Sequence, residues 1–272
     1  MNHPLTIATW NVRRPLQAGD PCFEAVAQKL RLINADIWVL TEAHDDLCPN
    51  ETYRAFESPR LPLMRPGERT TMIWVRPDWD ARAVPTFADL SPDEDPPRTT
   101  ATYAVTSRAT SPAVCAQVET PLGSLLIYGT VITWPNDTGP YGDDPTHKAD
   151  FAHLQHESIL VHHHDWSRLR EAYPAVSFCV AGDLNTTLDG RRYPTIPCSD
   201  ALRQALTENG MRHITQTLDH AIDHICLSHH WASHASDPCW WQTTYIDASG
   251  RGPKPVSDHR GVSITVTAEG PL

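Results

Sequence analysis

Acidic, amide and histidine side chains in this chain recur beside runs that alternate like β-strands. The segments that carry them are Thr9-Trp10-Asn11-Val12, Val39-Leu40-Thr41-Glu42, Gly182-Asp183-Leu184-Asn185, Ile222-Asp223-His224-Ile225 and Ser257-Asp258-His259. Carboxylate and amide oxygens can hold a hard cation, and a carboxylate can also take a proton from water. We therefore expect these side chains to line one pocket at strand ends, where water could be activated for attack.

The pair Asp183 and Asn185 is the most informative of these segments. If the chain stays extended there, the two-residue period of a strand puts both side chains on one face. A carboxylate beside an amide suits water attack, because the carboxylate takes the proton and the amide donates to a phosphoryl oxygen. The alternative is an Asx turn in which Asp183 caps Thr186 and Thr187. An EF-hand loop is excluded, since Leu188 stands where that loop needs glycine.

These segments resemble the motifs of the endonuclease/exonuclease/phosphatase superfamily, whose members have the DNase I-like fold. Gly-Asp-Leu-Asn and Ser-Asp-His are the specific motifs, and the set runs from residue 9 to residue 259. The resemblance implies an α/β (α+β) fold with two packed mixed β-sheets flanked by helices, a four-layer DNase I-like sandwich. We expect residues 1–272 to form a single domain of this kind.

The resemblance also implies roles for the residues that would act on a phosphate ester. Asp183 corresponds to the general base that deprotonates the attacking water. Asn11, Asn185 and His259 correspond to groups that bind phosphoryl oxygens, and Asp223 corresponds to the acid that orients His259. An acid beside a histidine raises the pKa of the ring and keeps it cationic towards a phosphate.

A divalent metal is the cofactor that the resemblance implies. Glu42, Asp258 and Asn11 would hold Mg²⁺ or Mn²⁺ through oxygen atoms. Mg²⁺ prefers few carboxylates together with waters and substrate phosphate. It would neutralise phosphate charge and support the developing oxyanion.

One position departs from the family pattern. A Tyr or His usually approaches the phosphate from the strand before Asp183, and Thr133 occupies that place here, followed by Trp134. A threonine hydroxyl can donate a hydrogen bond but is a poor acid, which weakens the analogy to the DNA-repair branch. Trp134 either contacts the substrate, by stacking on a base or closing the pocket, or belongs to the core. Arg13 or Arg14 is a further candidate to reach a substrate phosphate.

The remaining histidines are interpreted as bystanders. The run 162–164 fans around a predicted helix, so its rings cannot converge on one ion. His153 and His156 have i,i+3 spacing but no evident carboxylate partner. We expect all of these on a solvated helix face. His224 would point to the sheet face opposite Asp223 and is left out of the site.

Hydrophobic periodicity predicts the elements that position these residues. Strands are predicted over 5–12, 35–40, 70–76, 81–87, 100–107, 113–119, 124–133 and 176–181, and helices over 21–34, 146–171 and 199–209. Ser199 is the predicted cap of the last helix, which Gly210 ends.

Composition limits the partners. The 272 residues are 40% hydrophobic and 20% charged, as expected of a globular chain. The net charge of −11 argues against a broad surface that binds a polyanion electrostatically, although the arginines could form a small basic patch at a pocket entrance.

Seven scattered cysteines without C-x-x-C spacing indicate reduced thiols, and no signal peptide or membrane segment is visible. We expect a cytoplasmic monomer.

The sequence thus predicts a divalent-metal-dependent phosphoesterase that hydrolyses a phosphodiester or phosphomonoester by metal-assisted water attack. A nuclease is favoured within that class. The expected substrate is a phosphate ester, and nucleic acid is one candidate. The alternatives are a phosphatase of small or lipid phosphate esters and a non-catalytic binding module on the same scaffold.

Overall fold

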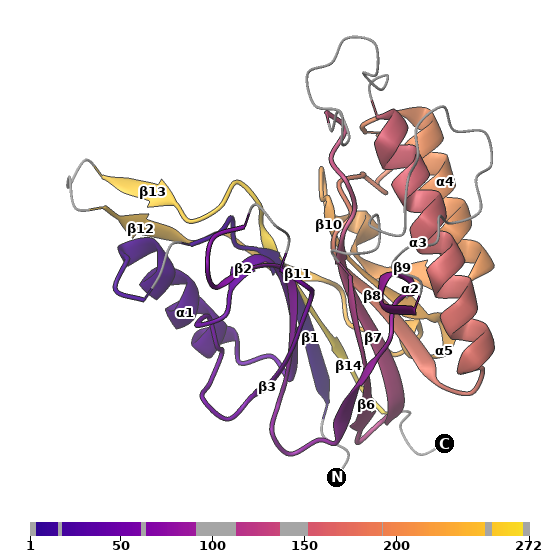
Figure 1. Ribbon diagram of the computed structural model, residues 1–272, viewed down its shortest axis with the longest axis horizontal. Coiled ribbons are helices and arrows are strands. Elements are labelled where there is room, and N and C mark those ends of the chain that lie inside the picture. The colour runs from indigo at the N-terminus through magenta and orange to yellow at the C-terminus, as the bar shows by residue number, and fades with distance from the viewer. Residues whose placement is uncertain are drawn as a thin grey trace.

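Two six-stranded mixed sheets pack face to face, with helices on their outer faces (Figure 1). The computed structural model describes residues 4–15, 18–60, 64–90, 113–136, 152–191, 193–247 and 252–268. The predicted DNase I-like sandwich of two mixed sheets and flanking helices is confirmed. The strand predicted over 100–107 lies outside the described residues.

The first sheet has the strand order β11-β14-β1-β2-β4-β3. Its strands are β1 (Leu5–Asn11), β2 (Ile37–His44), β3 (Arg54–Glu57), β4 (Glu68–Val75), β11 (Cys239–Trp241) and β14 (Gly261–Val266). Strand β1 runs parallel to β2 and antiparallel to β14. Helix α1 (Pro21–Ile33) covers the outer face, and it begins at Asp20, whose carboxylate accepts hydrogen bonds from the N–H groups of Cys22 and Phe23.

The second sheet has the order β5-β6-β7-β8-β10-β9. Its strands are β5 (Ala81–Val84), β6 (Val114–Thr120), β7 (Gly123–Val131), β8 (Ser177–Asp183), β9 (Met211–His213) and β10 (Asp223–Ser228). Helices α3 (His153–Ala172) and α4 (Ile196–Glu208) cover its outer face (Figure 1). The shorter elements are α2 (Phe87–Leu90), η2 (Ile214–Thr217), α5 (His229–Ala232) and the hairpin of β12 (Thr244–Ile246) and β13 (Pro253–Pro255).

The central strands bury side chains on both faces, which is why they read as nearly continuous apolar runs. In β1, Ile7 packs between the sheets, whereas its neighbour Ala8 packs under α1. In β7, Ile127 faces the inter-sheet core and Tyr128 faces α3 and α4. Both faces of these central strands are therefore covered by neighbouring elements.

The structure corrects several sequence-based boundaries. Helix α4 begins at Ile196, three residues before the predicted cap, because the side chain of Thr195 accepts the hydrogen bond from the N–H of Cys198. Strand β2 continues to His44, so Glu42 lies inside a strand rather than after one. None of the described helices is long and apolar enough to span a bilayer.

The prediction of a solvated face for all helix α3 histidines is wrong for His162. Its ring is fully buried, and Nδ1 donates to the carbonyl oxygen of Ser158 at 2.8 Å. Nε2 lies 2.8 Å from the hydroxyl of Thr130 on β7. Burial lowers the pKa of His162, so the ring is a neutral element of the helix–sheet contact.

Candidate active site

Strands of both sheets end at one edge of the sandwich. The parallel pairs β1–β2 and β7–β8 finish there, with Asn11 opposite Thr41 and Val131 opposite Asp183. Strand β10 starts at the same edge, since Asp223 pairs with Asp183 across the antiparallel β8–β10 ladder. Strand β1 also packs against β8 and β10 of the other sheet. Polar side chains from both sheets therefore meet at this edge.

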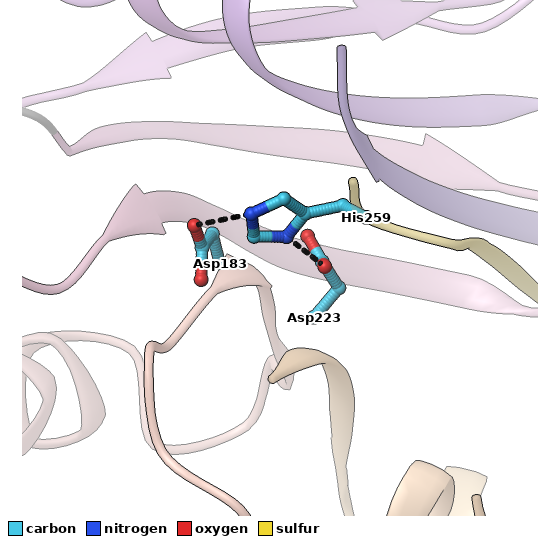
Figure 2. Close-up of side chains that lie close together, drawn as sticks. All are labelled: Asp183, Asp223 and His259. Atoms are coloured by element: carbon cyan, nitrogen blue, oxygen red, sulfur yellow. Dashed lines mark hydrogen bonds and ion pairs between the residues drawn. The ribbon is translucent and has the colours of Figure 1, made fainter. Parts of the chain in front are cut away.

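His259 stands between two buried carboxylates (Figure 2). Its Nδ1 lies 2.6 Å from Oδ2 of Asp223, and its Nε2 lies 3.9 Å from Oδ2 of Asp183. The Asp183 and Asp223 side chains are only 3% and 5% exposed, and that of His259 is 15% exposed. The short contact fixes the plane of the ring, while the longer one is an ion pair outside hydrogen-bond range.

The charges of this cluster depend on one another. Burial alone would lower the pKa of His259, but the hydrogen bond and charge of Asp223, together with the charge of Asp183, outweigh it and raise the pKa to about 9. Burial, followed by the negative charge of Asp223, raises the pKa of Asp183 to about 7. Burial also raises the pKa of Asp223, against the hydrogen bond to His259. At neutral pH the ring is thus cationic, and Asp183 is poised to exchange a proton.

Asn11 links the two sheets at the site. Its Nδ2 donates to Oδ2 of Asp183 at 3.0 Å and lies 3.3 Å from Oε1 of Glu42. Asn11 is 1% exposed, whereas the Glu42 side chain is 28% exposed. The carboxylate of Glu42 therefore opens towards solvent, on the same Asn11 amide that contacts the buried carboxylate of Asp183.

Three segments leave their strands or enter the site through the same kind of local turn. Oδ1 of Asn11 accepts from the N–H of Arg13 at 2.9 Å, and Oδ1 of Asp183 accepts from the N–H of Asn185 at 3.0 Å. The hydroxyl of Ser257 accepts from the N–H of His259 at 3.1 Å. Such i to i+2 bonds are Asx and ST turns, and they fix the direction of each polar side chain.

The extended conformation predicted for Asp183 to Asn185 is wrong. Strand β8 ends at Asp183, and Asn185 has a φ of 48°, because the Asx turn bends the chain into the left-handed region. The turn closes on the N–H of Asn185 rather than on Thr186 or Thr187. Nδ2 of Asn185 donates to the carbonyl oxygen of Ile132 at 2.8 Å. An amide carries two N–H donors, so one remains for a ligand.

Two arginines pair with the predicted metal ligands. Arg14 Nε lies 3.2 Å from Oε2 of Glu42, and Arg13 Nη1 lies 3.8 Å from Oδ1 of Asp258. Both arginines have positive φ values, 54° for Arg13 and 50° for Arg14, and their side chains are more than half exposed. The Asp258 side chain is itself 67% exposed, so its carboxylate lies at the rim of the site.

The segment after β7 lies beside Asn185, because the carbonyl oxygen of Ile132 accepts a hydrogen bond from Nδ2 of Asn185. Thr133 follows Ile132 and is partly buried. Trp134 is 56% exposed, which excludes the interpretation as a core tryptophan. His224, left out of the site, is 1% exposed and bonds to Thr215 and to the carbonyl oxygen of Thr186, away from the acids.

The donor atoms at this edge divide into two sets. Asp183, Asp223 and His259 bring ligand atoms within 4.8 Å of one another. However, His259 is held cationic, and a protonated imidazole has no lone pair for a metal. The partly exposed Glu42 carboxylate offers oxygen atoms, which fit a hard divalent cation by donor type. Asn11 turns Nδ2 towards Glu42, so only its Oδ1, which already accepts from the N–H of Arg13, could join Glu42 on a metal. By donor type Glu42 is therefore the better candidate ligand.

Sequence reasoning missed the supports of this site. Gln155 of α3 is fully buried, and its Nε2 donates to the carbonyl oxygen of Asn185 at 2.6 Å and contacts the hydroxyl of Thr186 at 3.1 Å. No local pattern marks a helix glutamine as the support of a distant turn. Trp240 and Arg260, which line a pocket beside His259, were also missed.

Gly182 is required immediately before Asp183. Its φ is 135°, and a Cβ atom there would lie 2.0 Å from the carbonyl oxygen of Thr130. We expect Gly182→Ala to lower the free energy of unfolding by at least about 2 kcal/mol and to displace Asp183. Urea unfolding and hydrolysis rates would measure both effects.

Gly123→Ala is the matched control for this substitution. Gly123 has a φ of 115°, and a Cβ atom there would meet no other atom within 4 Å. It lies at the opposite end of β7. The control variant should lose less stability and keep its activity. Equal losses in both variants would show that the backbone conformation, rather than the clash beside Asp183, accounts for the effect.

A family described as the Endonuclease/Exonuclease/phosphatase family matches residues 8–259 of the chain. Comparison with curated proteins gave no match.

Solved structures share the fold at low sequence identity. The endonuclease domain of TRAS1, a telomere-specific non-LTR retrotransposon, has a TM-score of 0.61 at 14% identity, covering 98% of this chain and 100% of that one. A mannosyl-6-phosphatase of Bacteroides thetaiotaomicron has a TM-score of 0.60 at 15% identity, covering 97% and 100%. The human Nocturnin catalytic domain has a TM-score of 0.59 at 13% identity, covering 97% and 93%. At these identities the likeness establishes the fold alone.

Proposed function

Because the chain belongs to the endonuclease/exonuclease/phosphatase family, whose members are hydrolases of phosphate esters, we propose that it is a Mg²⁺- or Mn²⁺-dependent phosphoesterase that acts by water attack. The observation that carries this proposal is the Asp223–His259–Asp183 cluster, with contacts of 2.6 Å and 3.9 Å. A cationic ring held between two buried acids combines a phosphate ligand with a base, which a simple binding surface would not need.

The chain's own groups suggest how the reaction would proceed. Asp183, with its pKa of about 7, takes the proton from the attacking water. His259, with its pKa of about 9, stays protonated and donates through Nε2 to a phosphoryl oxygen. Asp223 holds Nδ1 and so fixes the direction of Nε2. The free N–H of Asn185 is available to a second phosphoryl oxygen, while Asn11 orients Asp183.

The bound metal would neutralise the negative charge that develops on the phosphate oxygens. Glu42 and Asn11 would hold it, with Asp258 contributing from the rim. The carboxylate of Glu42 pairs with Arg14 and that of Asp258 pairs with Arg13, which indicates that these two carboxylates attract positive charge.

Glu42→Gln should raise the metal concentration needed for half-maximal activity by roughly tenfold or more. Glutamine keeps the shape and the oxygen that faces Asn11 but loses the charge. Calorimetric titration of Mn²⁺ into the protein would give the binding constant without reference to turnover, and thermal unfolding would confirm that the variant folds.

Glu119→Gln serves as its control, because Glu119 is exposed at the end of β6, across from the start of β7. Its metal dependence should match that of the wild type. If Glu42→Gln also retains wild-type metal affinity, Glu42 is not a ligand.

The function is tested by hydrolysis of bis-p-nitrophenyl phosphate with Mg²⁺ or Mn²⁺, with EDTA as the control. Metal-dependent release of p-nitrophenol that EDTA abolishes supports the proposal. A folded protein that binds phosphate esters without hydrolysing any of them would instead be the binding module. A panel with p-nitrophenyl phosphate, an oligonucleotide and a phosphoinositide then separates phosphatase, nuclease and lipid phosphatase.

We propose a small phosphodiester or a nucleic acid as the substrate, in a cytoplasmic and monomeric protein. The charge of −11 disfavours a long duplex-binding surface. All seven cysteines are free, which suits a reducing compartment.

A further inference from the structure

A pocket of about 300 Å³ opens directly beside the acid–histidine cluster. Asp223 and His259 form part of its wall, so whatever it holds lies next to the phosphate position. Leu218, Ile222 and Val262 give it an apolar lining. Its volume is at the lower end of the range for small-molecule sites, which suits one compact substituent rather than a polymer.

A flat platform forms another wall of this pocket. The guanidinium carbon of Arg260 lies 4.4 Å from the ring centroid of Trp240. Trp240 pairs with Val262 in the β11–β14 ladder, and Arg260 is two residues from Val262, so both side chains fall on one face. Trp240 remains 51% exposed although it is stacked. Exposed indole and guanidinium planes are surfaces on which nucleobases stack.

The charges of the pocket are unevenly compensated. Asp219 pairs with Arg191 at 3.4 Å, and Asp258 pairs with Arg13 at 3.8 Å. Arg260, in contrast, forms no ion pair with any carboxylate in the part of the chain that the structure describes. Among the described residues, the pocket therefore offers one guanidinium that no carboxylate pairs with, in the wall that His259 also lines, where an anionic ligand could contact it.

From this arrangement we propose that the pocket binds the nucleoside part of a mononucleotide ester, with the base stacked on the Trp240–Arg260 platform. The inference rests on the proposed function for the position of the phosphate, and it names the substrate class of that same site. A single nucleoside suits the pocket volume, and the acidic body of the protein disfavours a longer polyanion.

Adenosine 5′-monophosphate and ribose 5-phosphate provide a matched pair of probes, because they share the sugar phosphate and differ in the base. Calorimetric titration in EDTA measures binding without turnover. We expect the nucleotide to bind about tenfold more tightly, as stacking on one aromatic platform provides. Trp240→Ala should bring the two affinities together and leave that for ribose 5-phosphate unchanged.

Two further variants separate stacking from folding and charge. Arg260→Lys keeps the charge and loses the plane, so it should reduce the ratio of the two affinities but retain binding of ribose 5-phosphate. Trp79→Ala is the control, because it removes a second tryptophan–arginine contact, in which the guanidinium carbon of Arg76 lies 5.6 Å from the centroid of the Trp79 ring. Arg76 directly follows β4, at the end of that strand far from the site. In Trp79→Ala the ratio of the affinities for adenosine 5′-monophosphate and ribose 5-phosphate should remain that of the wild type.

Equal affinities for the two probes in the wild type, or no binding of either, would overturn the nucleoside proposal. So would an equal loss of both affinities in Trp240→Ala, or a single-stranded oligonucleotide that binds far more tightly than the mononucleotide. The bis-p-nitrophenyl phosphate assay on the same sample keeps the two proposals apart. If the protein hydrolyses bis-p-nitrophenyl phosphate but binds both probes equally, only the nucleoside site is wrong. If the two affinities differ but no hydrolysis is seen, only the proposed enzymatic activity is wrong.

Discussion

Asp183→Asn should remove most of the turnover, by about 10² to 10⁴-fold, because the variant lacks the group that we propose takes the proton from water. The asparagine keeps the size of the side chain and can still accept the Asx-turn bond from the N–H of Asn185. The loss should therefore appear in the rate and not in the fold. Single-turnover hydrolysis at saturating metal, with circular dichroism and thermal unfolding, would measure the two separately.

The rate of Asp183→Asn can exclude the proposed role of Asp183. A rate equal to that of the wild type would exclude Asp183 as the base. The buried amide of Asn11 donates to the same carboxylate, so Asn11→Ala provides a comparison in which the base is present but less well oriented. That variant should retain more activity than Asp183→Asn.

Asp223→Asn should leave a weaker but measurable activity, since in the proposed mechanism Asp223 acts only through His259, to which it is hydrogen-bonded. The variant removes the charge that keeps the ring protonated, so burial would then dominate and lower the pKa of His259. A loss larger than that in Asp183→Asn would mean that the roles of the two acids are reversed.

The pH dependence of Asp223→Asn gives the more specific readout. In the wild type, activity should rise as the pH increases through about 7, where Asp183 loses its proton, and fall above about 9, where His259 loses its own. In Asp223→Asn the alkaline limb should move to lower pH. An unchanged alkaline limb would contradict the assignment of Asp223 as the group that keeps His259 charged.

Much of this fold could be predicted from sequence because its signals are local. Strands such as β1 and β8 bury both faces and read as apolar runs, and α1 carries a single apolar stripe between Asp20 and Asn34. Polar residues at the ends of such runs were expected to lie close together, and the structure places Asn11 within hydrogen-bond distance of Asp183 and Asp183 3.9 Å from His259.

The rest depends on contacts between distant parts of the chain, which local patterns do not contain. The left-handed conformation of Glu42, with a φ of 49° inside strand β2, is not one that a glutamate favours by itself. The burial of His162 depends on Thr130 across the helix–sheet contact. The Trp240–Arg260 platform exists only because β11 pairs with β14, so neither residue indicates its neighbour in the sequence.

Strand β1 lies between β2 and β14, and its register joins Leu5 to Val266. During synthesis β1 leaves the ribosome before β14, and the other described strands are made between them, so this side of β1 stays unpaired until β14 emerges. His259 arrives with that late segment, two residues before β14 begins. Until then a nascent chain holds both acids without their histidine, so under the proposed mechanism it would be inactive. Pairing between such distant segments also predicts that the final closure of this sheet is slow.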